Sequence, residues 1–184
     1  MSLATIDQLA LRMLQDDQTI LDTAREISSI LQRIGVAGGV VGGIAVFLHG
    51  YRRTTTDIDV YCVDRSALGD ALKAAGYVWD DAERQFMKGD VPVQLLAPQD
   101  RLGFDPTHFQ DLEGVQAVSL ADLISMKLAS GTGNVHRMND LSDIVRLAHA
   151  NKIDKSFTPK IAPEYRKEFK VLMDRMATDP KREF

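Results

Sequence analysis

The stretch VVGGIAVFLHGYRRTTTDIDVYC, residues 40–62, decides the fold of this 184-residue chain. Gly42 and Gly43 lie between a short apolar run and a segment with the composition of a short helix. Asp57 and Asp59 open a run in which polar and apolar residues alternate, which is typical of a β-strand with one buried face. The stretch therefore predicts a strand, a glycine turn, a short helix and a second strand that begins with two acids.

The two acids are expected to share one face of that second strand. Because successive side chains of a strand point to opposite sides, Asp57 and Asp59 leave the same face, with Cα atoms roughly 6.5 to 7 Å apart. Two carboxylates at that spacing suit Mg²⁺ or Mn²⁺, which are hard cations that prefer oxygen ligands. Such ions neutralise and align the phosphates of a nucleotide. The pair therefore predicts a metal site for chemistry on a nucleotide.

Residues beside the acids favour the same use. Gly42 and Gly43, at a turn from strand to helix, let backbone N–H groups approach a phosphate, and a helix start adds positive potential. Arg53 and Thr55 offer contacts to phosphate oxygens. Each feature also has a plainer interpretation: D-x-D is often an exposed strand end, paired glycines can serve packing alone, and a polar loop needs no ligand. Spacing and order together favour the functional interpretation.

The whole stretch resembles the motif of the DNA polymerase β-like nucleotidyltransferase superfamily. In that motif a strand, a GG or GS pair, a short helix and a D-x-D strand follow one another. Thirteen residues separate Gly43 from Asp57, which suits the family. The form GG-A---HG--R-T-DID is most similar to the small prokaryotic branch. That branch includes minimal nucleotidyltransferases and the abortive-infection toxin-like proteins of toxin–antitoxin systems.

A later segment, SLADLISMKLASG followed by HRMNDLSDIVRLA, is similar to the same branch. There a helix that carries a lysine is followed by a turn and by a helix that opens with an R-x-K-D-L-x-D-I pattern. The resemblance extends over about residues 36–150. The first motif is the specific one, and the second supports it.

The resemblance implies a role for each matching residue. Gly42 and Gly43 would cradle the nucleotide phosphates, Asp57 and Asp59 would bind the metal ion and act in catalysis, and Lys127 would reach the triphosphate. Judged by its own surroundings in the sequence, Lys127 is equally well a solvated residue of a helix.

Three residues of the second segment carry a weaker implication. The resemblance implies that Arg137, Asp140 and Asp143 organise the helical flank of the site. Helix capping and surface pairing at a spacing of three residues is the plainer account of all three.

The chain departs from the family pattern at one position. The family carries a third carboxylate in a context such as V-D-L-L, and Gln94 stands there in VPVQLLAP. Glutamine offers a neutral oxygen ligand and no base. Asp90 lies four residues earlier, which is roughly 13 Å along a strand, and is expected in the turn KGD.

Two functions therefore stay open. In the first, the chain is a transferase that moves a nucleoside monophosphate from a nucleoside triphosphate to an acceptor hydroxyl, with pyrophosphate leaving. The acceptor is then activated by the metal alone or by another base. In the second, the chain is a degenerate member that binds a nucleotide or a partner protein without efficient catalysis. Glycosyltransferases, haloacid-dehalogenase phosphatases and dinucleotide-binding folds match the motif less well, because they place their glycines or acids differently.

The fold class expected is α+β, with a small mixed β-sheet flanked by helices and a helical C-terminal half. We expect a single nucleotidyltransferase-like domain over residues 1–184, with a core at 36–118 and a helical portion at 119–184. A helix is predicted over 18–34, and a loop of low regularity over 101–117. The site is expected in the groove between the sheet and the helical half.

Composition limits the partners. The net charge of −4 argues against a general polyanion binder. Cys62 is the only cysteine, which predicts a reducing cytoplasm, and no signal peptide or membrane span is expected. The acceptor is a tRNA end, a protein side chain or a small molecule, and an antitoxin-type protein partner belongs to the same set of expectations.

Overall fold

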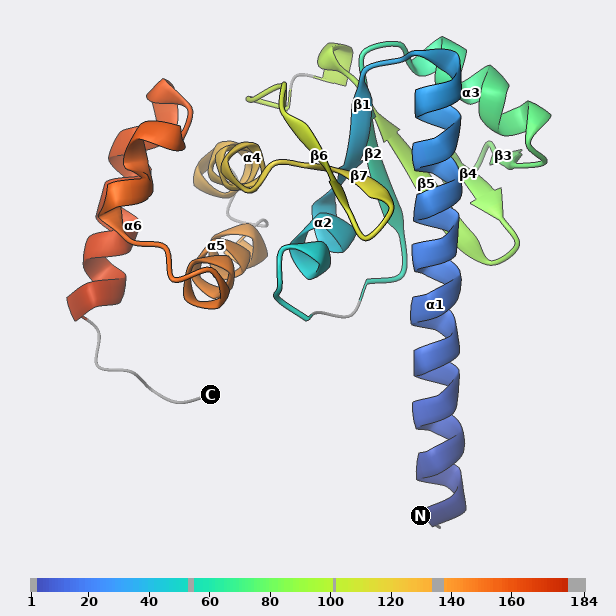
Figure 1. Ribbon diagram of the computed structural model, residues 1–184, viewed down its shortest axis with the longest axis horizontal. Coiled ribbons are helices and arrows are strands. Elements are labelled where there is room, and N and C mark those ends of the chain that lie inside the picture. The colour runs from blue at the N-terminus through green and yellow to red at the C-terminus, as the bar shows by residue number, and fades with distance from the viewer. Residues whose placement is uncertain (1–2, 53–54, 101, 134–137, 179–184) are drawn as a thin grey trace.

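The structure, a computed structural model, describes residues 3–52, 55–100, 102–133 and 138–178 (Figure 1). Within these ranges the chain has an α+β fold built on one seven-stranded sheet. The strands are β1 (Gly38–Val41), β2 (Ile58–Cys62), β3 (Val78–Asp80), β4 (Gln85–Lys88), β5 (Val91–Leu96), β6 (Phe109–Leu112) and β7 (Val115–Val118). The α-helices are α1 (Leu3–Ile34), α2 (Gly42–Leu48), α3 (Arg65–Ala74), α4 (Leu120–Gly133), α5 (Met138–Ala150) and α6 (Arg166–Thr178). Short 3₁₀ helices are η1 (Pro98–Asp100), η3 (Lys155–Lys160) and η4 (Pro163–Tyr165).

The sheet is mixed, as expected from the sequence. Its strand order is β3-β4-β5-β2-β1-β7-β6. At the centre, β2 pairs antiparallel with β1 and parallel with β5, while β1 pairs parallel with β7. The strand that carries the D-x-D motif is therefore covered on both edges, and its side chains have fixed neighbours on each side.

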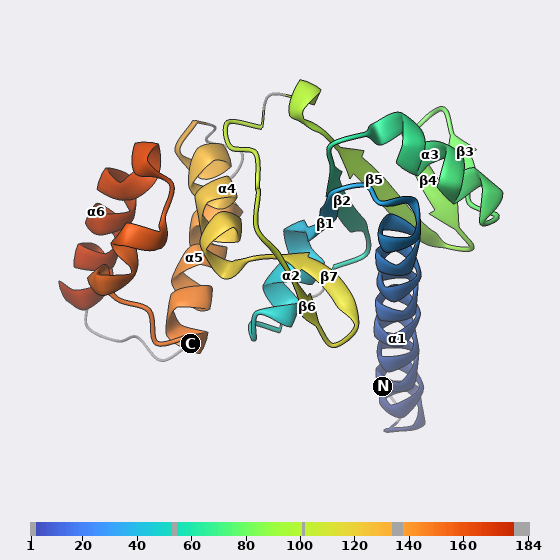
Figure 2. The same cartoon turned by 45° about the horizontal axis from the view of Figure 1, so that its top comes forward.

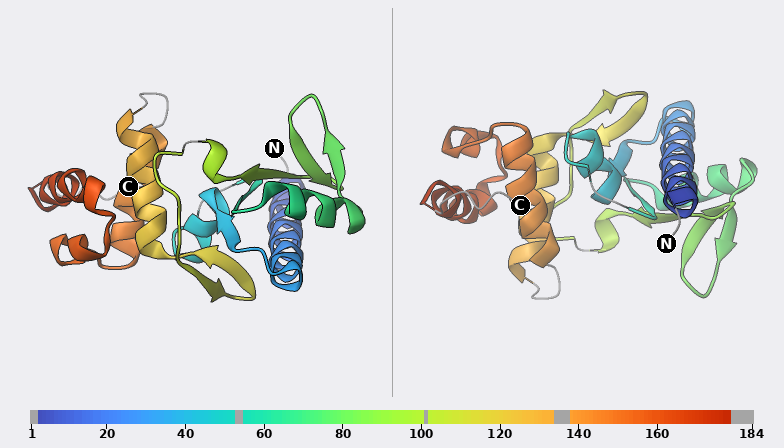
Figure 3. Two further views of the ribbon diagram at one scale, coloured as in Figure 1. Left: turned by 90° about the horizontal axis from the view of Figure 1, so that it is seen from above. Right: turned by 90° about the horizontal axis from the view of Figure 1, so that it is seen from below.

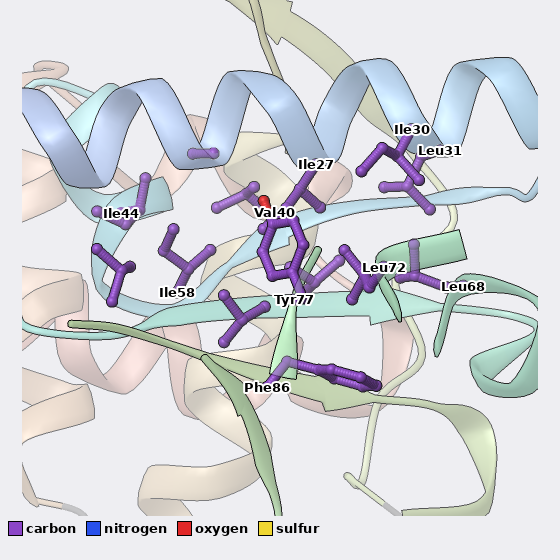
Figure 4. Packing of buried hydrophobic residues seen from close by; sticks show 14 of the residues in the cluster. Ile27, Ile30, Leu31, Val40, Ile44, Ile58, Leu68, Leu72, Tyr77 and Phe86 are labelled. Carbon is purple, nitrogen blue, oxygen red and sulfur yellow. The ribbon is translucent and has the colours of Figure 1, made fainter. Parts of the chain in front are cut away.

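Alternate side chains of β2 point to opposite faces of the sheet and enter two different hydrophobic clusters. Ile58, Val60 and Cys62 are fully buried in a cluster that α1 and α3 cover (Figure 4). Tyr61 belongs to the cluster on the opposite face, which packs against α2, α4, α5 and α6. Asp59 shares this second face. The two faces from Ile58 to Cys62 are therefore as the sequence predicts, but β2 begins at Ile58, so Asp57 precedes the strand instead of opening it.

Helix α1 is longer than predicted. It begins at Leu3 rather than near residue 18. Ile20, Ala24, Ile27 and Leu31 recur at helical spacing and are buried against the sheet. The part of the helix before these residues extends beyond the sheet (Figure 1).

The C-terminal half is helical and lies on the other side of the sheet from α1 (Figures 2 and 3). Phe169 and Met173 of α6 are buried with Leu147 of α5 and Leu128 of α4. The last strand ends at Val118, and α4 begins two residues later at Leu120.

The prediction of an irregular loop over 101–117 is wrong in its second half. Strands β6 and β7 form an antiparallel hairpin there, and β7 joins the sheet beside β1. The two turn residues, Glu113 and Gly114, both have positive φ, at 55° and 83°. Two-residue turns of this kind match the twist of a hairpin, which explains why such short strands pair.

No helix in the described part of the chain combines the length and the apolar character that crossing a membrane requires.

Candidate active site

The turn between β1 and α2 brings a glycine against the second acid. Val41 is the register partner of Asp59 on the neighbouring strand, and Gly42 follows with φ at +62°. A Cβ placed on Gly42 would lie 2.0 Å from Asp59 Oδ2. Residue 42 therefore needs to be glycine for two reasons, because its backbone is left-handed and the Asp59 carboxylate occupies the side-chain position.

The second glycine makes the matching contact with the loop before β2. A Cβ on Gly43 would lie 2.5 Å from Thr55 Oγ1. That hydroxyl donates to Asp57 Oδ1 over 3.0 Å. Thr55 thus contacts both Gly43 and Asp57, next to the contact between Gly42 and Asp59. The glycines let the side chains of the acidic segment approach the turn, which is a reason that sequence reasoning did not supply.

A cavity of about 150 Å³ lies between the sheet and α4. It is the groove that the sequence predicts between the sheet and the helical half. Its polar wall includes Asp59, Gln94, Lys127, Ser130 and Asp140. The remaining lining residues are Val41, Gly42, Leu96, Leu102, Leu123 and Met126. Polar groups on the sheet therefore face polar groups on two helices, with apolar side chains beside them.

Gln94, which stands where the resemblance implies an acid, lies beside Asp59. It is the register partner of Asp59 on the parallel strand β5, and its side chain is exposed to the cavity. Asp90 lies in the exposed turn between β4 and β5, as expected. Among the residues described, no three His, Cys, Asp or Glu side chains are grouped so that they could hold a metal ion. The Gln94 amide is thus the nearest side-chain oxygen that β5 offers to Asp59.

Lys127 is not a solvated helix residue. Its side chain is 7% exposed, and Nζ lies 2.8 Å from Asp140 Oδ1 and 2.8 Å from Asp143 Oδ2. The account of Asp140 and Asp143 as surface pairing residues is therefore wrong, because Asp143 is buried and both acids reach across from α5 to α4. The structure brings Lys127 into the same cavity as Asp59.

Tyr61, two residues beyond Asp59, is not a candidate base. Burial, together with a hydrogen bond to Asp105, raises the pKa of Tyr61 to about 12. Its hydroxyl is therefore protonated near neutral pH.

Some predicted site residues fall elsewhere. Arg53 and Arg137 lie outside the described residues. Gly43, Thr55 and Asp57 are not among the residues that line the cavity. Thr55 contacts Gly43 and donates to Asp57, so the three lie together beside the glycine turn. Ser130 lines it, though sequence reasoning missed it, and donates to Asp140 Oδ2 over 2.6 Å. Its spacing of three residues from Lys127 on a helix was the only available signal.

A D-x-D strand in the middle of a mixed sheet, with a glycine turn beside it and helices beyond, is the architecture of the nucleotidyltransferase fold. Solved structures agree. An antigenic nucleotidyltransferase-like protein from Paracoccidioides brasiliensis is similar at 15% identity and a TM-score of 0.52, over 84% of this chain and 87% of that one.

Two further solved structures are similar to the same degree. For the antibiotic-resistance factor ANT(2'')-Ia the identity is 13% and the TM-score 0.53, over 88% of this chain and 94% of that one. For JHP933 from Helicobacter pylori the values are 16% and 0.53, over 90% of each chain. No protein-family model matches the sequence, and no curated protein does either. The comparisons therefore establish the fold.

Proposed function

We propose that this chain is a metal-dependent nucleotidyltransferase that moves a nucleoside monophosphate from a nucleoside triphosphate to an acceptor hydroxyl. The observation that carries the proposal is the Asp59 carboxylate held against Gly42 in a cavity that also contains Lys127. An acid and an ammonium that face one cavity suit a ligand with a cation-bound polyphosphate. The residues of the two sequence motifs, more than 60 positions apart, converge there.

The donor set fits Mg²⁺ or Mn²⁺. Asp57 and Asp59 would hold the ion through carboxylate oxygens, and the amide oxygen of Gln94 is a neutral ligand of the same hard type. Thr55 fixes one oxygen of Asp57, which leaves the other for the ion. When bound, the ion would supply neutralisation of phosphate charge and alignment of the reacting oxygens.

The chain's own residues would divide the remaining work. Backbone N–H groups at Gly42 and Gly43 would contact phosphate oxygens, where the absence of Cβ atoms keeps the approach open. Lys127 would bind the polyphosphate. The acceptor oxygen forms a bond to the α-phosphorus, the bond from that phosphorus to the β-phosphate bridge breaks, and pyrophosphate leaves with the bonding electrons. The acceptor's proton passes to water or to a base other than Gln94.

Gln94 supports a second candidate, a protein that binds a nucleotide or a partner protein without efficient catalysis. It lies beside Asp59, where an acid would take a proton from the acceptor, and an amide has no such capacity. Where the second candidate binds a nucleotide, it shares the nucleotide site with the first and differs from it only in turnover.

The proposal has three versions, which differ in the molecule that supplies the acceptor hydroxyl. A tRNA end, a protein side chain and a small molecule each offer a hydroxyl. An antitoxin-type partner protein and a cytoplasmic location, which follow from the resemblance and from the single cysteine, stay predictions.

Two experiments test the proposal. Calorimetric titration of ATP, GTP, CTP and UTP, each with Mg²⁺, is expected to reveal binding of at least one. Incubation of that α-labelled triphosphate with the protein and a cell extract is expected to transfer label to RNA, protein or a small molecule. Binding without transfer favours the second candidate, and no binding of any triphosphate refutes both nucleotide roles.

A substitution at Asp57 tests the metal role of the motif, and the same substitution at Asp90, outside the motif, is its matched control. Asp57→Asn is expected to abolish Mg²⁺-dependent binding, whereas Asp90→Asn, at an exposed turn, is expected to leave it unchanged. If Asp57→Asn binds as tightly as the wild type, the metal role of the D-x-D motif is wrong.

A further inference from the structure

Lys127 is held by two acids, of which only one lines the cavity. Asp140 and Asp143 each lie 2.8 Å from Nζ, while Asp140 contributes to the cavity wall and Asp143 is buried behind it with 7% of its side chain exposed. Ser130 donates to the second oxygen of Asp140. The ammonium therefore has a defined position between α4 and α5.

The donor count leaves Lys127 able to bind a ligand. An ammonium has three N–H donors, and the two carboxylates use two of them. The remaining donor makes Lys127 suited to a direct contact with an anionic ligand.

We propose that Asp143 is a positioning residue that, with Asp140, holds the Lys127 ammonium at the cavity wall to bind the polyphosphate of a nucleotide. The inference rests on the proposed function. It adds Asp143 to the residues on which nucleotide binding depends, although Asp143 itself touches no substrate. A lysine side chain has four rotatable bonds, and an unpaired one would lose much of its conformational freedom on binding a phosphate. With the two carboxylates in place, that entropy is lost on folding instead.

Replacing Asp143 has two opposite effects on the binding of an anion: the loss of its negative charge favours binding, and the loss of its hold on Lys127 weakens it. Removal of a carboxylate raises the local positive potential, which by itself favours an anion. Asp143→Asn removes the charge and keeps an oxygen acceptor, whereas Asp143→Ala removes both. The difference between these two variants therefore isolates the positioning effect.

The test uses Mg²⁺–tripolyphosphate, titrated by calorimetry into the full chain. Asp143→Asn is expected to bind within about threefold of the wild type or more tightly, and Asp143→Ala about tenfold more weakly than Asp143→Asn. In a Lys127→Met background the two variants are expected to bind alike, because Asp143 acts through Lys127. Equal binding of the Ala and Asn variants in the wild-type background, or a difference that persists without Lys127, overturns the proposal.

A buried acid elsewhere controls for general destabilisation. Asp122 of α4 is 6% exposed and accepts from the backbone N–H groups of Thr107 and His108, away from Lys127. Asp122→Ala is expected to lower stability without weakening tripolyphosphate binding. If Asp143→Ala does not fold, Asp143→Asn carries the test, since a tenfold loss of binding in that folded variant contradicts the proposal.

Failure of this inference differs from failure of the proposed function. If the wild type binds a Mg²⁺–nucleotide in a way that Asp57→Asn abolishes but Lys127→Met does not alter, only the role of Lys127 and Asp143 is refuted. If no triphosphate and no tripolyphosphate binds the wild type, both proposals are refuted.

Discussion

Gln94 lies directly beside Asp59, because the two residues are register partners on the parallel strands β5 and β2 and both line one cavity. A carboxylate at position 94 would share that cavity with Asp59, so the two negative charges would repel each other unless a cation lay between them. The pairing therefore makes residue 94 the place to test whether this chain has lost efficient catalysis.

Gln94→Asp is expected to restore the missing acid. In EDTA the melting temperature should fall below that of the wild type, and Mg²⁺ should raise it more in the variant, because the cation offsets the added repulsion. If the wild type transfers label slowly, the variant is expected to do so faster. Gln110→Asp, on the exposed edge strand β6, is the matched control and should show no added response to Mg²⁺. Equal responses in both variants would refute a shared cation site at Asp59 and residue 94.

Gly42→Ala is expected to disturb both stability and the site. The left-handed backbone at residue 42 costs a Cβ-bearing residue about 1 kcal/mol, and the new Cβ would displace the Asp59 carboxylate. Gly76→Ala is the control, since Gly76 has φ of +85° and open space where its Cβ would lie. Chemical denaturation should show a loss in both variants, whereas Mg²⁺–nucleotide affinity should fall at least about tenfold only in Gly42→Ala. Parallel behaviour of the two variants would mean that the contact with Asp59 is irrelevant to binding.

Thr55→Ala tests whether the hydroxyl orients the first acid. Thr55 Oγ1 donates to Asp57 Oδ1, and the loss of one such hydrogen bond is worth about 1 kcal/mol, or roughly fivefold in Mg²⁺–nucleotide affinity. Thr55→Ser keeps the hydroxyl and is expected to bind like the wild type. A calorimetric titration that finds the Ala and Ser variants equally weak would assign the effect to the lost methyl group instead.

Local pattern predicted the part of the site that lies close together in the sequence. The alternation of β2 indicated which side chains leave with Asp59. The resemblance to a known motif, rather than the local pattern, singled out Gln94, and the structure pairs it with Asp59. The identity of the partners of Lys127 was beyond such reasoning, because Asp140 and Asp143 are 13 and 16 residues further on and reach it only through the packing of α5 on α4.

Two elements of the fold were missed for different physical reasons. The β6–β7 hairpin has strands of four residues each, too short for a clear alternation, so its main signal was the Glu113–Gly114 turn. Helix α1 begins at Leu3 because its first turns continue a helix whose later part is fixed by burial of Ile27 and its neighbours. Tertiary packing thus completed the hairpin, whereas the first turns of α1 extend beyond the sheet.

His49 is expected to make stability depend on pH below its ordinary pKa of 6.5. The ring is buried at the end of α2, where Nε2 lies 2.8 Å from the Val118 carbonyl oxygen, and burial lowers the pKa of His49 in the folded chain. Since the unfolded chain then binds a proton more readily, stability is full above pH 6.5 and declines as the pH falls below it, by at most about 1.4 kcal/mol per pH unit. Denaturation curves between pH 7.5 and 5.5 should show this decline.

The variant His49→Gln distinguishes the effect of protonating His49 on stability from the effects of the other ionisable groups. Its amide can donate to Val118 as the imidazole does, but it does not titrate, so the other ionisable groups of the chain affect both proteins alike. The variant is expected to be less stable than the wild type at pH 7.5, because its shape differs from that of the ring, and to lose less stability on acidification. Identical pH dependence in the two proteins would show that the buried ring takes up its proton as easily in the folded chain as in the unfolded one.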